Sequence, residues 1–148
     1  MSSAGITAID FPGTAADTRD AKDRDLRVSL RRVLVVEDEA IICVDTADAL
    51  ERQGFQVETA LSGETALLRL RSGLPIDILF TDINLAGAMD GLTLAVLARD
   101  LNPGLVVVYT SGSMSAVPDG VPGSAFVAKP YNPDRVGVLL GRLARIHA

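Results

Sequence analysis

The chain has 148 residues, of which 48% are hydrophobic, and its 14 Lys plus Arg against 19 Asp plus Glu give a net charge of -5. This length suits one domain with one core, and a single Cys excludes an intrachain disulfide, which fits a reducing compartment. The acidic balance argues against a nucleic-acid partner, because phosphate contacts need clustered Lys and Arg. No membrane span or secretory signal is recognisable, so we expect a cytoplasmic protein.

The acidic surplus lies entirely in the second part of the chain. Residues 1–31 contain five acids and five bases, whereas residues 32–148 contain 14 acids and 9 bases. We interpret 1–31 as an N-terminal extension, either a solvated tail or a partly helical segment, and 32–148 as the folded domain. Lysine is rare, since Arg takes 12 of the 14 basic positions and Lys129 is the only Lys after residue 31.

From Arg32 onward, apolar runs typical of buried strands alternate with helical patterns. Residues 33–36 form the first run, and the next segment carries apolar residues at helical spacing up to Gly54, which suits a helix end. A weaker strand is predicted at 55–60. Ser62 is then placed to cap a helix that ends near Gly73.

The second half of the chain continues this alternation. A strand is predicted at 76–80, a helix at 92–101, a strand at 105–110 and another at 125–128. Residues 111–124 contain Pro118 and Pro122, so any fourth helix must be short or irregular. Asn132 is expected to cap a last helix that runs to about residue 146. Five such strands alternating with helices predict an α/β fold, a doubly wound parallel sheet with helices on both faces.

In such sheets, ligands bind outside the carboxyl ends of the strands. The residues that follow the predicted strands there are Glu37, Asp38, Asp82, Thr110 with Ser111, and Lys129. Three neighbouring carboxylates repel one another unless a cation is present, and an oxygen-only ligand set suits Mg²⁺. The sequence therefore predicts a magnesium site at this edge.

A divalent cation beside an ammonium and a hydroxyl is what phosphoryl transfer requires. A carboxylate can accept the phosphoryl group as an aspartyl phosphate. Asp82 follows the third of the five predicted strands, which is expected to be central in the sheet, and is the best-placed acceptor.

Four segments in this order, VLVVEDEA, LFTDINL, VVYTSG and FVAKPY, resemble the signature segments of response-regulator receiver domains of bacterial two-component systems. The resemblance covers about residues 32–148 and implies the CheY-like, flavodoxin-like strand order 2-1-3-4-5. It implies a cis peptide bond before Pro130. It also assigns the site residues by position: Asp82 as phosphoacceptor, Asp38 as a direct Mg²⁺ ligand, Glu37 as a ligand through water, Asn84 through its backbone carbonyl, Thr110 and Phe126 as switch residues, and Lys129 as the partner of Asp82 and then of the phosphate.

The resemblance also implies a function and partners. A histidine kinase or histidine phosphotransfer protein would pass its phosphoryl group to Asp82, and the chain would act as a regulatory protein, promoting only its own phosphorylation and dephosphorylation. If residue 148 ends the full protein, no output domain is present and the signal leaves by protein contact. A homodimer is left open. Two departures stand out: the loop after Asp82 lacks Pro and is about one residue longer than usual, and residues 113–123 are expected to be mobile.

The sequence disfavours three alternative functions. A haloacid-dehalogenase-type phosphatase also uses an Asp nucleophile after a strand, but it needs a second Asp where this chain has Asn84. A nucleotide-binding doubly wound domain needs a Gly-rich first turn, whereas EDEA is acidic and would repel a pyrophosphate. A pseudo-receiver without phosphorylation is disfavoured, because every chemistry-bearing position is filled.

Overall fold

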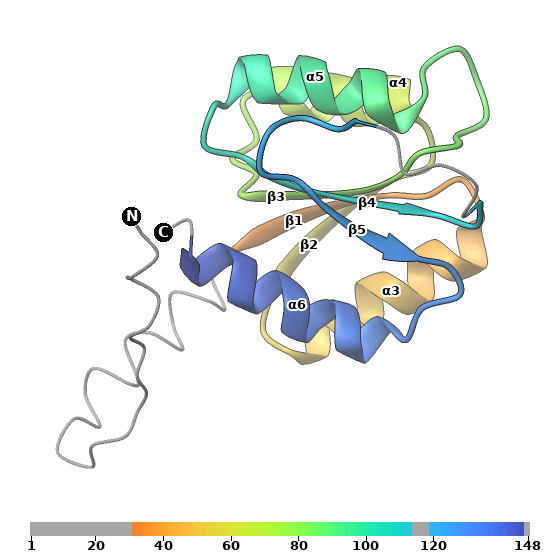
Figure 1. Cartoon of the computed structure of the whole chain (residues 1–148), viewed down its shortest axis with the longest axis vertical. Coiled ribbons are helices and arrows are strands. Elements are labelled where there is room, and N and C mark those ends of the chain that lie inside the picture. The colour runs from red at the N-terminus through yellow and green to blue at the C-terminus, as the bar shows by residue number, and fades with distance from the viewer. Residues whose placement is uncertain (1–30, 114–118, 147–148) are drawn as a thin grey trace, which may run out of the picture.

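The computed structural model describes residues 31–113 and 119–146, in which a parallel sheet lies between two layers of helices (Figure 1). The predictions for residues 1–30 and 114–118 lie outside the described residues. The elements in chain order are β1 (Arg32–Val36), α3 (Ala40–Arg52), β2 (Gln56–Ala60), α4 (Gly63–Arg71), β3 (Ile78–Asp82), α5 (Gly91–Leu101), β4 (Val106–Ser111), β5 (Ala125–Ala128) and α6 (Pro133–Ile146).

The sheet has the order β2-β1-β3-β4-β5 with every pair parallel, so the predicted doubly wound topology is confirmed. Val36 pairs with Thr81, Asp82 with Thr110, and Ser111 with Ala128. Because the strands are parallel and in this register, the carboxyl ends of β1, β3, β4 and β5 meet at one edge of the sheet. The segments that carry the predicted site residues therefore begin side by side.

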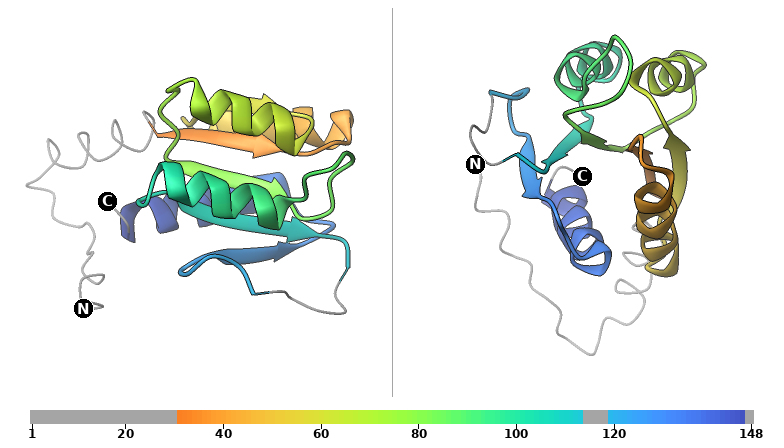
Figure 2. Two further views of the ribbon diagram at one scale, coloured as in Figure 1. Left: turned by 90° about the horizontal axis from the view of Figure 1, so that it is seen from above. Right: turned by 90° about the vertical axis from the view of Figure 1, so that its right-hand side faces the viewer.

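Alternating side chains of the strands build two cores, one on each face of the sheet. Leu34 and Val36 of β1 pack in the core under α4 and α5, whereas Val33 and Val35 pack in the core over α3 and α6. The right-hand view in Figure 2 shows the two helical layers on opposite sides of the sheet. These four side chains of β1 are at most 1% exposed, which explains the unbroken apolar run in the sequence.

Several predicted boundaries moved by one or two residues. The third strand extends to Asp82 instead of ending at Phe80, because Asp82 still pairs with Thr110. The helix predicted at 92–101 begins at Gly91, since the side chain of Asp90 accepts a hydrogen bond from the Thr93 N–H and caps it. The predicted Ser62 cap is confirmed by its hydrogen bond from the Thr65 N–H.

The segment between β4 and β5 contains no helix in its described part, residues 112–113 and 119–124. Two contacts hold the second of these stretches. The Tyr109 hydroxyl accepts a hydrogen bond from the Val121 N–H at 3.1 Å, and Arg99 Nη1 donates to the Pro122 carbonyl at 2.9 Å. The predicted loss of a regular fourth helix is thus seen in these residues, while the predicted mobility of 113–123 stays a prediction.

Candidate functional site

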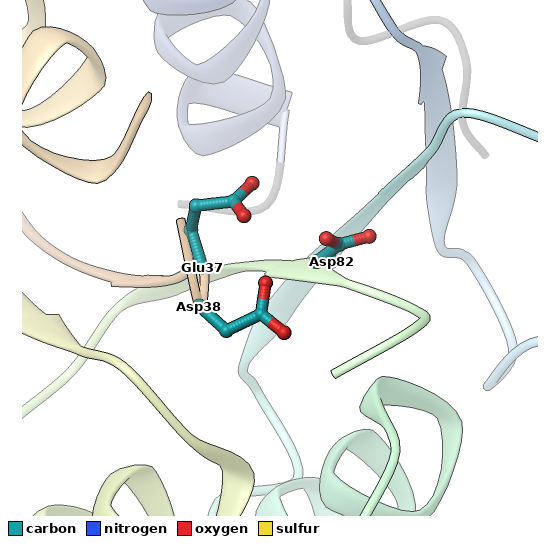
Figure 3. A group of neighbouring side chains, drawn as sticks. All are labelled: Glu37, Asp38 and Asp82. Atoms are coloured by element: carbon teal, nitrogen blue, oxygen red, sulfur yellow. The ribbon is translucent and has the colours of Figure 1, made fainter. Parts of the chain in front are cut away.

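An acidic cluster lies at the carboxyl edge of the sheet, where β1 and β3 end. Glu37 and Asp38 follow β1, and Asp82 is the last residue of β3; one carboxylate oxygen of each lies within 4.8 Å of the others. Figure 3 shows the Glu37 and Asp38 side chains leaving the end of β1 on opposite sides, with both carboxylates turned toward Asp82. Three oxygen donors at this spacing form a set that a small, hard divalent cation can fit.

Lys129 is the counter-charge to this cluster. It follows β5, and its Nζ lies 2.7 Å from Glu37 Oε1 and 2.9 Å from Asp82 Oδ2. Burial lowers the pKa of the ammonium group, but its hydrogen bonds with Glu37 and Asp82 outweigh this effect and raise the pKa, so Lys129 stays charged at neutral pH. The peptide bond between Lys129 and Pro130 is cis, as predicted.

The two innermost carboxylates are poorly hydrated. Glu37 is 2% exposed and Asp82 is 5% exposed. Burial raises the pKa of each carboxyl group, and Lys129 opposes the increase. Repulsion from Asp82 raises the pKa of Glu37 further, and repulsion from Asp38 raises that of Asp82 further. One ammonium against three carboxylates leaves the site with an excess of negative charge, which favours binding of a cation.

Thr110 and Ser111 end β4 beside Asp82, and their hydroxyls differ in hydrogen bonding. The Thr110 hydroxyl oxygen is buried, and no hydrogen-bond partner for it exists among the residues described. The Ser111 hydroxyl is engaged, because it accepts hydrogen bonds from Asn84 Nδ2 at 3.2 Å and from the Ser113 N–H at 3.1 Å. A buried hydroxyl without a partner is uncommon, which sets Thr110 apart from Ser111 in the described residues.

Phe126 lies in β5 opposite Tyr109 and packs, half-buried, against the core under α4 and α5. The predicted switch residue is thus near Thr110 in the sheet. Tyr109, which the sequence analysis did not single out, is buried and uses its hydroxyl to hold the Val121 N–H. An aromatic residue directly after three Val residues was the one signal that could have drawn attention to it.

A groove of about 510 Å³ opens beside Lys129, between the start of α3 and the loop before α6. Its lining includes Ile42, Thr46 and Tyr131. Tyr131 and Thr46 share a hydrogen bond of 2.8 Å between their hydroxyls, and the Tyr131 ring packs edge-on against Phe80. Neither residue could be predicted from the sequence, because nothing local links two positions that lie 85 residues apart.

Comparisons with known proteins agree with this geometry. A family model for the response regulator receiver domain matches residues 33–138. The nitrogen assimilation regulatory protein NtrX of Azorhizobium caulinodans is 32% identical over 117 residues, which make up 74% of this chain and 25% of that protein. The response regulator receiver protein CpdR of Brucella abortus is 32% identical over 105 residues, or 71% of this chain and 75% of that protein.

Among solved structures, the response regulator receiver protein from Sinorhizobium medicae superposes with a TM-score of 0.75 at 32% identity, covering 80% of this chain and 97% of that one. The chain spans about a quarter of NtrX and about half of the transcriptional regulatory protein TcrX of Mycobacterium tuberculosis. In the described residues, no helix is both long and apolar enough to cross a membrane. Sequence, topology and the acidic edge of the sheet agree, and the chain belongs to the response regulator receiver domain family.

Proposed function

We propose that this chain is a phosphoacceptor of a two-component or phosphorelay system and that Asp82 receives the phosphoryl group. The observation that carries the proposal is the setting of Asp82 itself. Asp82 is 5% exposed, and its carboxylate lies 2.9 Å from Lys129 Nζ. It pairs in the sheet with Thr110, whose buried hydroxyl has no hydrogen-bond partner among the described residues. The Asp82 carboxylate, the Lys129 ammonium and the Thr110 hydroxyl thus lie at the ends of neighbouring strands, and aspartyl-phosphate chemistry requires groups of these three kinds.

The transfer proceeds from a phosphohistidine of a histidine kinase or a histidine phosphotransfer protein. An Asp82 carboxylate oxygen forms a bond to phosphorus as the bond from phosphorus to the imidazole nitrogen breaks, and the donor imidazole takes up a proton. Lys129, already paired with Asp82, neutralises charge on the phosphoryl oxygens. Asp38, Asp82, the Asn84 carbonyl and, through water, Glu37 would hold Mg²⁺, which would supply further charge neutralisation for the transfer.

Thr110 converts the phosphorylation into a conformational signal. Its hydroxyl is buried and has no partner among the described residues, so a phosphoryl oxygen on Asp82 offers it the missing acceptor. Movement of Thr110 toward the phosphate changes the packing on the neighbouring strand β5, where Thr110 pairs with Val127, the residue after Phe126. A change at β5 can be read by a partner protein, because β5 is an edge strand of the sheet.

The face for the phosphodonor lies over the start of α3. Ile41 and Val44 of α3 are 78% and 56% exposed, beside the groove that leads to Lys129. Exposed aliphatic side chains next to an active site are typical of a protein interface. A histidine phosphotransfer surface seated here would bring its imidazole to Asp82 over the Lys129 side of the site.

Labelling with a small phosphodonor tests the chemistry. Incubation with acetyl phosphate and Mg²⁺ should add one phosphoryl group per chain, and Asp82→Asn should abolish the addition. Asp100→Asn is the matched control, because Asp100 is an exposed residue near the end of α5. Labelling of Asp82→Asn at the wild-type level would refute the assignment of the acceptor.

A second experiment tests the donor face separately. The double variant Ile41→Ser with Val44→Ser should slow transfer from a cognate histidine phosphotransfer protein while leaving labelling by acetyl phosphate unchanged. Val96→Ser serves as the control, since Val96 is 53% exposed but lies on α5 in the opposite helical layer. Equal transfer rates to the wild-type chain and to the double variant would contradict this docking face.

A further inference from the structure

The loop from Ile83 to Asp90, which follows the phosphoacceptor, is held by two carboxylates from outside the loop. One is Asp38 of the acidic cluster, which accepts a hydrogen bond from the Ala86 N–H at 2.8 Å. The other is Glu64, in the first turn of α4, which belongs to none of the groups considered above. This loop is also the one for which the sequence predicts a departure from the family, in its length and its lack of Pro.

Glu64 binds the last residues of the loop through their backbone N–H groups. Its Oε2 accepts hydrogen bonds from the Ala88 N–H at 3.0 Å and from the Met89 N–H at 3.1 Å. The loop passes so close that a Cβ added at Gly87, whose φ is +103°, would lie 3.1 Å from Glu64 Oε1. A carboxylate that accepts two N–H groups of consecutive residues fixes the local direction of the backbone.

The two ends of the loop are held together by a backbone hydrogen bond. The Gly91 N–H donates to the Ile83 carbonyl at 2.8 Å, so the two ends of the loop are joined at the carboxyl end of β3. Between these ends, the two external carboxylates bind N–H groups that lie two residues apart, at Ala86 and Ala88. A displacement of the loop at Ala88 is therefore transmitted over two peptide units to the contact with Asp38.

We propose that Glu64 is a positioning residue for the cation site: it holds the loop so that the Ala86 N–H orients the Asp38 carboxylate and the Asn84 carbonyl faces the acidic cluster. The inference rests on the proposed function of that cluster. Metal affinity depends on the ligands and also on the hydrogen-bond partners that orient them. Here a carboxylate from a neighbouring helix holds a loop that contains no proline of its own.

The hydrogen bonds of Glu64 are exposed to solvent, so a role in positioning the cation site can be distinguished from a role in the stability of the fold. Glu64, Ala88 and Met89 form their hydrogen bonds at the surface, where water can replace a lost acceptor. Removal of Glu64 should therefore leave the thermal stability of the fold almost unchanged. It should loosen the loop and weaken binding of the cation, an effect that a purely structural residue would not produce.

Calorimetric titration of the full chain with MgCl₂ tests the proposal. We expect Glu64→Ala to raise the Mg²⁺ dissociation constant about tenfold, at the low end of the range for lost partners of metal ligands. Glu64→Gln, which keeps one acceptor oxygen, should recover part of this loss. Glu51→Ala is the matched control, since it also removes one exposed carboxylate, at the other end of α3 from the site.

Two further readouts complete the test. Labelling by acetyl phosphate should fall in Glu64→Ala at low Mg²⁺ and return to the wild-type rate at saturating Mg²⁺. Without any Mg²⁺, amide exchange at Ala88 and Met89 should accelerate in Glu64→Ala and stay at the wild-type rate in Glu51→Ala. Unchanged exchange at these two amides, or an unchanged dissociation constant, would overturn the role of Glu64. A wild-type chain that neither binds Mg²⁺ nor takes a phosphoryl group would instead overturn the proposed function.

Discussion

Replacement of Lys129 by methionine tests how the acidic cluster is balanced. The substitution keeps an unbranched side chain but removes the ammonium that lies 2.7 Å from Glu37 and 2.9 Å from Asp82. Loss of one partner of a fully buried ion pair costs about 3–5 kcal/mol. Because the Lys129 side chain is 16% exposed at the edge of the sheet, we expect a smaller loss of unfolding free energy, about 2 kcal/mol at neutral pH.

For the roughly 110 described residues, a loss of this size lowers the melting temperature by roughly 9 °C. The loss should depend on pH in a definite direction. Burial raises the pKa of Glu37 and of Asp82, so the stability these carboxyl groups contribute is present at low pH and is lost as the pH rises through their folded pKa. Lys129 opposes this increase in pKa. In Lys129→Met the pKa values of Glu37 and Asp82 rise further. The loss of unfolding free energy relative to wild type is therefore largest at neutral pH and becomes smaller as acid protonates the two carboxylates.

Urea unfolding in the presence of a chelator, at pH 7 and at pH 5, measures this difference. Arg142→Met is the control, because Arg142 is exposed on α6 and its loss should change stability little. Introduction of Asp82→Asn into Lys129→Met should recover stability at pH 7, since it removes one of the uncompensated charges. A variant as stable as wild type at pH 7, or a deficit that grows in acid, would refute this electrostatic account.

Three other outcomes follow from the structure. Tyr109→Phe removes the acceptor of the buried Val121 N–H and should cost about 1–2 kcal/mol in urea unfolding, whereas an unchanged midpoint would show that water replaces the hydroxyl. Gly91→Ala places a Cβ against the backbone carbonyl of Asp82, so it should destabilise the chain by about 2 kcal/mol or more and slow acetyl-phosphate labelling; retention of both properties would mean that α5 shifts freely. Mg²⁺ at about 100 times its dissociation constant should add about 2.7 kcal/mol to the unfolding free energy, reversibly on chelation, and a melting temperature insensitive to Mg²⁺ would contradict a cation site at the acidic cluster.

Much of the fold could be predicted because its signals are local. The buried strands read as continuous apolar runs, since each is covered on both faces, and the helix ends carry cap residues such as Ser62 and Asn132. Boundaries were less certain. The end of β3 moved to Asp82 because the pairing of a strand continues for as long as its neighbour does, and this neighbour lies about 28 residues away.

The candidate site was predictable for a related reason. Parallel strands bring their carboxyl ends to one edge, so residues just after the strands meet whatever their separation in the chain. That rule alone selected Glu37, Asp38, Asp82 and Lys129, and the resemblance to receiver domains added their proposed roles. Their order along the chain and the strand pattern were sufficient for this selection.

Contacts between elements could not be read from the order of residues. The Thr46–Tyr131 hydrogen bond, the Tyr109 contact with Val121 and the grip of Glu64 on the loop after Asp82 join positions 85, 12 and about 24 residues apart. Such contacts depend on how helices pack and on which side-chain orientation the packing permits. The order of residues determined which groups gather at the edge of the sheet. The packing decided which of them are hydrogen-bonded and which, like the buried Thr110 hydroxyl, have no partner among the described residues, because hydrogen bonds form only when the elements come together.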